Sequence, residues 1–201
     1  MANKTSLVPI INSALSLESA LLQNPLSPAP QDVVEAQVLL EVDCYGFDDL
    51  LHHGQIVVHM DVASDVIVFF ELALALKFPI QSVIPIADER FHFDDELSCN
   101  QNNTSGYNYR TIMGADKLSK HALGLAFDVN PVQNIYVRYG EAGNEIYRLP
   151  AGGTYNKFAA GTLTKHHPLV TLMEKRGWFW GGNWGPRNGL VDYQHFEKTS
   201  V

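Results

Sequence analysis

One ten-residue segment constrains the fold of this chain more than any other. Residues 119–128 read Ser-Lys-His-Ala-Leu-Gly-Leu-Ala-Phe-Asp. From Gly124 to Asn130, small or polar side chains alternate with large apolar ones, which is typical of a β-strand with one buried face. Asp128 then lies on the face with small side chains, where there is room for a ligand. Gly124 can adopt a positive φ, and the resulting turn would aim His121 at the same place.

A second segment near the C-terminus supplies further polar groups. Residues 192–197 read Asp-Tyr-Gln-His-Phe-Glu. Tyr193, His195 and Glu197 have the same parity along a strand. Asp192 has the other parity, so we expect it in the loop that enters this strand.

Together the two segments offer the groups of a catalytic metal site. His121, Asp128 and His195 would be three protein ligands that leave one position open, as in catalytic zinc sites, whereas structural zinc is usually held by four ligands. Asp192 would remain as a proton acceptor for an activated water. The sequence therefore predicts a hydrolase with one Zn²⁺ ion.

Composition excludes several classes of partner. The chain has 201 residues, 46% of them apolar and 18% charged, as in an ordinary globular protein. Its net charge of -8 argues against a nucleic-acid partner, which would require a basic face. No stretch has the roughly 20 apolar residues of a membrane span. The partly apolar run 7–17 is too diluted by polar residues to be a clear signal peptide.

Cys44 and Cys99 are too few for a Cys-rich metal site. They could form one disulfide if the protein is exported, or remain two free thiols. We favour two free thiols.

The chain divides into an N-terminal arm with a Pro-rich linker, residues 1–32, and one compact domain, residues 33–201. Within the arm we expect a short helix over 10–23. The elements expected in the domain are strands over 36–45, 55–62, 82–86 and 107–112, a polar loop over 94–105, and helices over 64–77 and 168–176. The first of these helices is apolar on nearly every side, which predicts that it is buried as the central helix of the fold, and Gly177 can end the second.

These motifs resemble the zinc peptidases of bacterial cell walls. That family includes D-alanyl-D-alanine carboxypeptidases, D-alanyl-D-alanine dipeptidases and L-alanyl-D-glutamate endopeptidases, some from phage, and hedgehog signalling domains share the fold. The resemblance covers residues 36–197 and is most specific in 119–128 and in Gly-Trp-Phe-Trp-Gly-Gly-Asn-Trp of 177–184. It implies an α+β, hedgehog/DD-peptidase-like fold, with a small, mostly antiparallel sheet and helices packed on one face. Residues 33–201 would then be a zinc peptidase domain.

The resemblance also implies a role for individual residues. His121, Asp128 and His195 would be the zinc ligands, and Asp192 the catalytic base. Residues 105–111, Ser-Gly-Tyr-Asn-Tyr-Arg-Thr, are similar to the family's Ser-Gly-Tyr-Arg-Thr segment with two residues inserted. Arg110 would then stabilise the oxyanion or bind a substrate carboxylate.

Three further residues are candidates for contacting substrate or supporting the site. Ser119 could orient a ligand or bind substrate, and Tyr109 lies beside Arg110. Trp180 belongs to an aromatic, Gly-rich run that also contains Trp178 and Trp184. This run could form either core or one wall of a cleft, and the sequence leaves both alternatives open.

The implied function is hydrolysis of peptidoglycan stem peptides by metal-activated water, in the periplasm or outside the cell. Relatives that cut D-alanyl-D-alanine often carry Glu where this chain has Asp192. We therefore favour an L-alanyl-D-glutamate endopeptidase, with a D-alanyl-D-alanine carboxypeptidase as the alternative. A non-catalytic, zinc-containing binding module of the hedgehog-like fold is the alternative of another class. A separate wall-binding module is not expected, because the chain ends four residues after Glu197.

Overall fold

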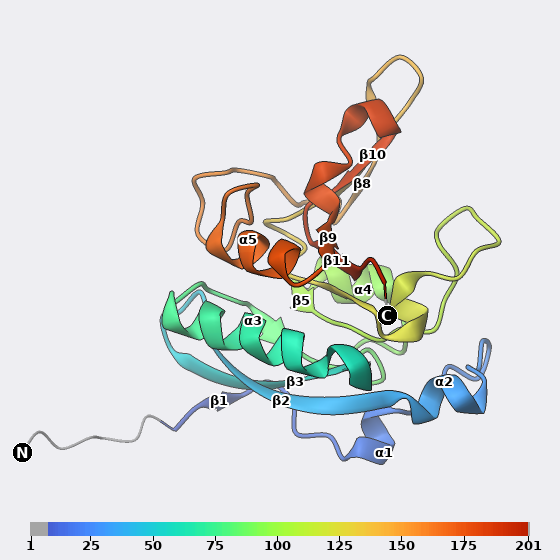
Figure 1. The fold of residues 1–201 in the computed structure, drawn as a ribbon, viewed down its shortest axis with the longest axis vertical. Coiled ribbons are helices and arrows are strands. Elements are labelled where there is room, and N and C mark those ends of the chain that lie inside the picture. The colour runs from blue at the N-terminus through green and yellow to red at the C-terminus, as the bar shows by residue number, and fades with distance from the viewer. Residues whose placement is uncertain (1–7, 201) are drawn as a thin grey trace, which may run out of the picture.

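The computed structural model describes residues 8–200 and has an α+β architecture (Figure 1). The strands are β1 (Ile10–Ile11), β2 (Gln37–Tyr45), β3 (Leu51–His59), β4 (Ser82–Val83), β5 (Asn103–Thr104), β6 (Ala126–Asp128), β7 (Tyr136–Tyr139), β8 (Glu145–Leu149), β9 (Trp178–Trp180), β10 (Leu190–Asp192) and β11 (His195–Lys198). The helices are α1 (Leu17–Ala20), α2 (Gln31–Glu35), α3 (Ala63–Ala75), α4 (Asp95–Asn100) and α5 (Pro168–Lys175). Short 3-10 turns are η1 (Met60–Val62), η2 (Lys120–Leu123), η3 (Gly181–Asn183) and η4 (Pro186–Asn188).

The strands form several small sheets, so the expectation of a single sheet was wrong. Their orders are β1-β3-β2, β10-β7-β8, β6-β11-β9 and β4-β5. Pairing is antiparallel except for β1 with β3 and β4 with β5. Most strands after β3 have only two to five residues and are separated by turns. Short strands of this kind cannot extend one ladder across the molecule.

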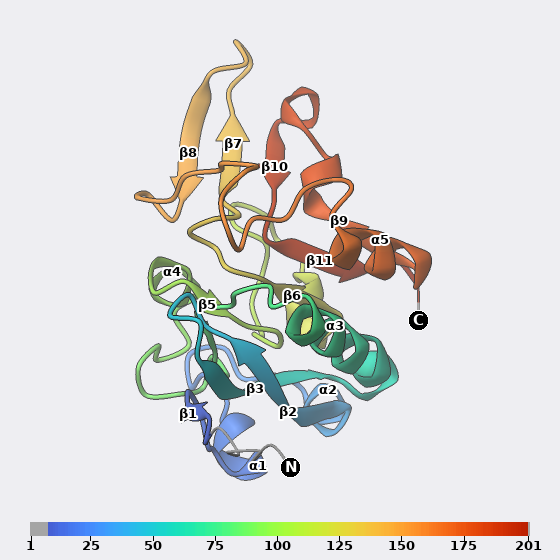
Figure 2. The ribbon, with the colours of Figure 1, turned by 90° about the vertical axis from the view of Figure 1, so that its left-hand side faces the viewer.

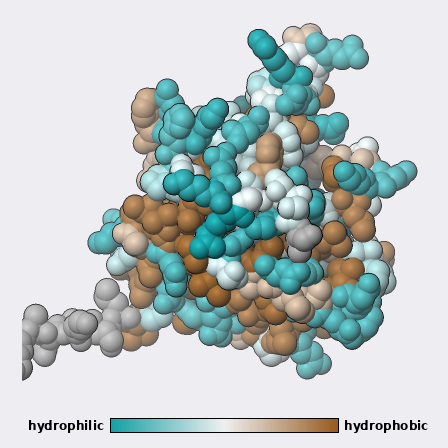
Figure 3. Space-filling model, viewed as in Figure 1, coloured by the Kyte–Doolittle hydropathy of each residue, from teal (hydrophilic) through white to brown (hydrophobic). Residues whose placement is uncertain are grey.

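The main core surrounds α3, which lies between the β2–β3 hairpin and the layer of α5 and β9 (Figures 1 and 2). The ring of Phe69 contacts the rings of Phe127 and Phe196 edge-on, at centroid distances of 5.0 and 5.7 Å. Helix α3 is not buried all round, because Ile67 on its outer side is 40% exposed. Apolar side chains accordingly reach the surface over α3 (Figure 3).

The sheet β6-β11-β9 confirms the alternation predicted around Asp128. His195 lies directly opposite Asp128, and Phe196 lies directly opposite Phe127. The two phenyl rings stack at 5.2 Å on the core side. Asp128 and His195 therefore project together from the other face, since opposed residues of an antiparallel pair share a face.

The arm differs from the predicted helix over 10–23. It runs as β1 beside β3 and then forms the short helix α1. The buried amide of Gln55 decides this path: its Oε1 accepts from Ser13 Oγ and from Leu15 N, both at 2.7 Å. A continuous helix would leave Gln55 unsatisfied inside the protein. The proposed domain boundary at residue 33 stays a prediction.

Other elements follow the sequence more closely. The hairpin of β2 and β3 and the helices α3 and α5 are confirmed, and Gly177 has a φ of 78° after α5. Three expectations were wrong in part. Residues 107–112 form no strand, the strand near 82 has only two residues, and the expected loop over 94–105 contains α4 and β5. Cys44 and Cys99 are buried free thiols, as favoured. Within residues 8–200 no helix combines the length and apolarity needed to cross a membrane.

Candidate metal centre

His121 reaches the site from the turn η2, which precedes β6. Ser119 caps this turn, because its Oγ accepts from His121 N at 3.2 Å. Gly124 ends the turn with a φ of 66°, as predicted. A Cβ atom at this position would lie 1.9 Å from Gln37 Oε1 and 2.5 Å from His59 N, so only glycine fits.

Three potential ligand atoms converge at one point. His121 Nε2 lies 3.1 Å from His195 Nδ1 and 3.3 Å from Asp128 Oδ2. His195 Nδ1 lies 3.0 Å from Asp128 Oδ1. With metal–ligand bonds of about 2.0 Å, neighbouring ligands of a tetrahedral ion are about 3.3 Å apart. The cluster of His121, Asp128 and His195 could therefore bind one metal ion.

The partners on the outer sides of the imidazoles support the same conclusion. His121 Nδ1 lies 2.7 Å from Gly106 O, and His195 Nε2 lies 3.2 Å from Glu197 Oε2. Both partners are acceptors, so these nitrogens donate. When the rings are neutral, the inner nitrogens then carry lone pairs, which face each other and a carboxylate in a buried place. A cation is what such a set of acceptors requires.

The charges of the buried groups favour a positive charge between them. Burial alone would raise the pKa of Asp128, but the charges and hydrogen bonds of His121 and His195 outweigh it and hold that pKa far below its usual value. Burial alone would lower the pKa of His195, yet its bonds to Asp128 and Glu197 raise it to about 10. A proton or a metal ion could supply this charge.

Asp192 lies beside the cluster, although its place in the chain differs from our expectation. It is the last residue of β10, which pairs with β7, and two further residues lead to β11. Among the described residues its buried Oδ1 has no hydrogen-bond partner. Burial, and then the charge of Asp128, raise the pKa of Asp192 well above its usual value. Such an unpaired oxygen is suited to accept a proton.

Arg110 lies near enough to the carboxylates of Asp128 and Asp192 to interact with both electrostatically. Burial alone would lower its pKa, but the charges of Asp95 and Asp128 raise it. Arg110 Nη2 donates to Asp95 Oδ2 of α4 at 2.9 Å. Its Nε is buried without a partner in the described part of the chain, so one donor is free.

Some residues of the aromatic run 178–184 lie in the core and another borders the candidate metal centre, so both alternatives apply in part. Trp178 and Trp180 belong to the main core, and Trp180 is only 2% exposed. Trp180 Nε1 donates to Tyr193 O at 2.8 Å, which holds the turn between Asp192 and His195. Only the third indole borders the centre: the ring of Trp184 stacks on His195 at 5.7 Å. Trp180 thus has a supporting position, and its predicted role stays a prediction.

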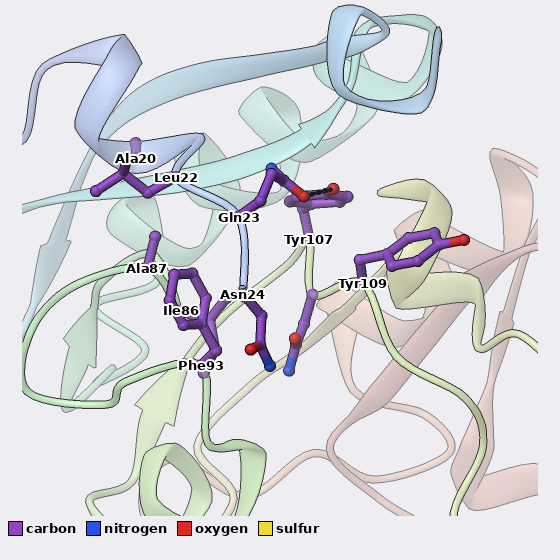
Figure 4. A pocket seen from close by; sticks show the side chains of 10 residues that line it. Ala20, Leu22, Gln23, Asn24, Ile86, Ala87, Phe93, Tyr107 and Tyr109 are labelled. Atoms are coloured by element: carbon purple, nitrogen blue, oxygen red, sulfur yellow. Dashed lines mark hydrogen bonds between the residues drawn. The ribbon is translucent and has the colours of Figure 1, made fainter. Parts of the chain in front are cut away.

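Tyr109 lies toward the arm. It lines a small cavity of about 10 Å³ together with Tyr107, Gln23 and neighbouring residues of the arm (Figure 4). In this view the ring of Tyr107 lies against Gln23, and its hydroxyl group donates to Gln23 Oε1 at 3.1 Å. The Tyr109 ring points away from the cavity. A substrate contact by Tyr109 stays a prediction.

Three groups at the site were missing from the residues predicted by the sequence. They are the carbonyl group of Gly106 and the carboxylates of Glu197 and Asp95. Glu197 carried a signal, because it shares strand parity with His195. Asp95 carried none, since its contact with Arg110 depends on how α4 packs against the segment that carries Arg110.

Comparison with known proteins finds a similar family for part of the chain. Residues 113–198 match the family model described as D-alanyl-D-alanine carboxypeptidase. No curated protein and no solved structure matches the chain. The matched span contains the three potential metal ligands and Asp192, whereas Arg110 lies just outside it, and the match supports a peptidase. Over residues 113–198, less than half of its length, the chain is therefore similar to the D-alanyl-D-alanine carboxypeptidase family of cell-wall peptidases.

Proposed function

We propose that this protein is a zinc-dependent peptidoglycan peptidase, with the hedgehog/DD-peptidase-like arrangement, that hydrolyses stem peptides in the periplasm or outside the cell. The observation that carries the proposal is the convergence of ligand atoms from His121, Asp128 and His195 beside the unpaired carboxylate of Asp192. The family match over residues 113–198 supports it. When bound, zinc would supply the Lewis acid that activates water and polarises the scissile carbonyl group.

The chain's own residues would move the proton and orient the reacting groups. Asp192 would accept the proton of the attacking water at Oδ1 and return it to the leaving amine. The free Nε donor of Arg110 would stabilise negative charge on the carbonyl oxygen or bind a substrate carboxylate. Glu197 would keep the Nε2 proton of His195 on the outer side, so that Nδ1 faces inward.

Two candidate peptidase activities differ in the peptide bond that is cut. Asp192, with the Trp-Gly-Gly-Asn-Trp run before it, favours cleavage between L-alanine and D-glutamate. The description of the matching family model favours the second candidate, a D-alanyl-D-alanine carboxypeptidase. In both substrates the residue that carries the leaving amine has a free α-carboxylate. Arg110 could bind this carboxylate in either case.

Mass spectrometry of peptidoglycan digests tests the proposal. The zinc-loaded protein should release a peptide that begins with D-glutamate, whereas free D-alanine would select the carboxypeptidase. A chelator should abolish either product. Cleavage of casein instead of stem peptides would indicate a general protease. Absence of any product would contradict the proposal and favour the non-catalytic, zinc-containing binding module.

A further inference from the structure

One face of the sheet β10-β7-β8 carries Asp192 together with a mixture of polar, aromatic and apolar side chains: Tyr136, Arg138, Tyr147, Leu149 and Leu190. Asp192 lies opposite Tyr136, and Leu190 lies opposite Arg138. Opposed residues, and residues two apart on one strand, share a face of an antiparallel sheet. Asp192, Tyr136 and Arg138 therefore project from one side. The other side carries Val137, which packs in a small separate core with Ile135 and Val191.

Arg138 is half-buried, as are Arg110 and Arg148, but it differs from them in having no partner among the described residues. Within residues 8–200 no hydrogen bond or ion pair reaches its guanidinium group. Four other arginines each pair with a carboxylate: Arg90 with Asp88, Arg110 with Asp95, Arg148 with Glu145, and Arg176 with Asp65. The chain has 22 acidic and only 14 basic side chains, so carboxylates are plentiful. A partly desolvated guanidinium group with five unused donors is therefore suited to an anion from outside the chain.

The position of Arg138 relates it to the reaction site. A Cβ atom on Gly114 would lie 3.7 Å from Arg138 Nη1, so the guanidinium group borders the loop 111–118. Arg110 and Ser119 are the two ends of this loop, and the bond from Ser119 N to Arg110 O closes it at 3.1 Å. Arg138 is the diagonal neighbour of Asp192 across the two strands, a separation of about 7–8 Å. This is roughly the length of two residues of an extended peptide.

We propose that Arg138 binds a carboxylate of the stem peptide about two residues from the scissile bond. The inference rests on the proposed function, because that function names the substrate. Two carboxylates of a stem peptide could supply the anion: the side-chain carboxylate of a diaminopimelate third residue, or the C-terminal carboxylate. The third residue is two positions from the bond in both candidate reactions. A planar guanidinium group recognises either carboxylate through two parallel hydrogen bonds.

Stem peptides that differ by one carboxylate test the assignment. Diaminopimelate and lysine at the third position differ by this group alone, and each peptide can carry a free or an amidated C-terminus. For the wild type, removing the recognised carboxylate should lower kcat/KM about tenfold or more, since a charge-assisted bidentate pair is lost. Arg138→Gln should show the same loss on the best substrate and should no longer discriminate among the four. Arg148→Gln, which removes an arginine of the same sheet, should behave like the wild type.

Binding of the four peptides to the Asp192→Asn protein tests the role of Arg138 separately from the proposed peptidase function. Calorimetry should show that adding Arg138→Gln weakens binding of only the peptides with the recognised carboxylate. If Arg138→Gln kept the wild-type preference, or weakened all four peptides equally, the role of Arg138 would be overturned while the proposed function stood. If the wild type cleaved no peptide, the proposed function would fail, and the binding measurement would still decide whether Arg138 selects a carboxylate.

Discussion

In the candidate metal centre, each imidazole is oriented by an acceptor on its outer side. For His121 this acceptor is the backbone oxygen of Gly106, and for His195 it is Oε2 of Glu197. Removing the outer acceptor frees the imidazole to rotate and to change its tautomer. The affinity for metal then falls although every ligand is still present.

Glu197→Ala should therefore weaken zinc binding about 10- to 100-fold. Competition with a chromophoric chelator measures this affinity. Glu174→Ala is a matched control, because Glu174 only accepts a bond from exposed Asn183. Equal zinc affinity of the Glu197 variant and the wild type would show that His195 is oriented by other contacts.

Asp192→Asn should lower kcat about 10²- to 10⁴-fold, since an amide cannot accept the proton of the attacking water. The zinc content should not change, because Asp192 lies outside the cluster of ligand atoms. Steady-state kinetics on stem peptides, together with metal analysis of the same sample, separates these effects. Loss of zinc in this variant would instead make Asp192 a ligand.

At the scale of secondary-structure elements, Gly124 links the turn η2 to β6. Its positive φ and its tight contact with Gln37 act together, so Gly124→Ala should lower the free energy of unfolding by about 2–4 kcal/mol. Gly143 is the matched control, because its φ of 74° is similar but nothing lies within 4 Å of a Cβ there. Gly143→Ala should cost only about 1 kcal/mol, for the backbone alone. Urea denaturation measures both values, and equal losses would contradict a role for packing at Gly124.

Secondary-structure elements with a regular sequence pattern could be predicted from the sequence. The β2–β3 hairpin, α3 and α5 carry regular patterns or clear end signals, and the alternation around Asp128 correctly predicted the face from which this side chain projects. The helix expected over 10–23 failed because Gln55, far along the chain, binds that segment in an extended form. The short helix α4 was missed, although Asp94 caps it by accepting from Leu97 N. Local patterns do not contain contacts such as that of Asp95 with Arg110.

At the scale of the whole molecule, Asp65 on α3 connects the layers of the core. Its carboxylate accepts from Arg176 Nη1 at 2.7 Å, Trp178 Nε1 at 2.9 Å and Lys198 Nζ at 2.8 Å. Arg176 directly follows α5, Trp178 belongs to β9 and Lys198 belongs to β11. The Asp65 side chain thus connects α3 to the sheet β6-β11-β9, which carries His195.

This connection predicts an acid-sensitive stability. Burial alone would raise the pKa of Asp65, but hydrogen bonds from Lys198, Trp178 and Arg176 outweigh it and lower the pKa below its usual value. A lowered pKa in the folded state stabilises the protein above the pKa of the unfolded chain, about 3.9. This stabilisation is lost as the pH falls through the folded-state pKa.

Asp65→Asn should therefore lower the free energy of unfolding by about 3 kcal/mol or more at pH 7. The difference from the wild type should shrink as the pH falls below about 4. Urea denaturation of both proteins at several pH values measures it, and exposed Asp116→Asn serves as the control. A difference that is the same at pH 7 and pH 3 would exclude the ionised carboxylate as its source.

The acceptor that orients His121 is a main-chain carbonyl group, and this has an evolutionary consequence. No side-chain substitution can delete the oxygen of Gly106, so drift in the surrounding residues leaves the ligand aligned as long as the chain keeps its path. Residues 107–109 lie between this oxygen and Arg110. A change in the length of this segment could therefore move the arginine without removing the acceptor that orients His121. Substrate preference and metal binding can then diverge independently.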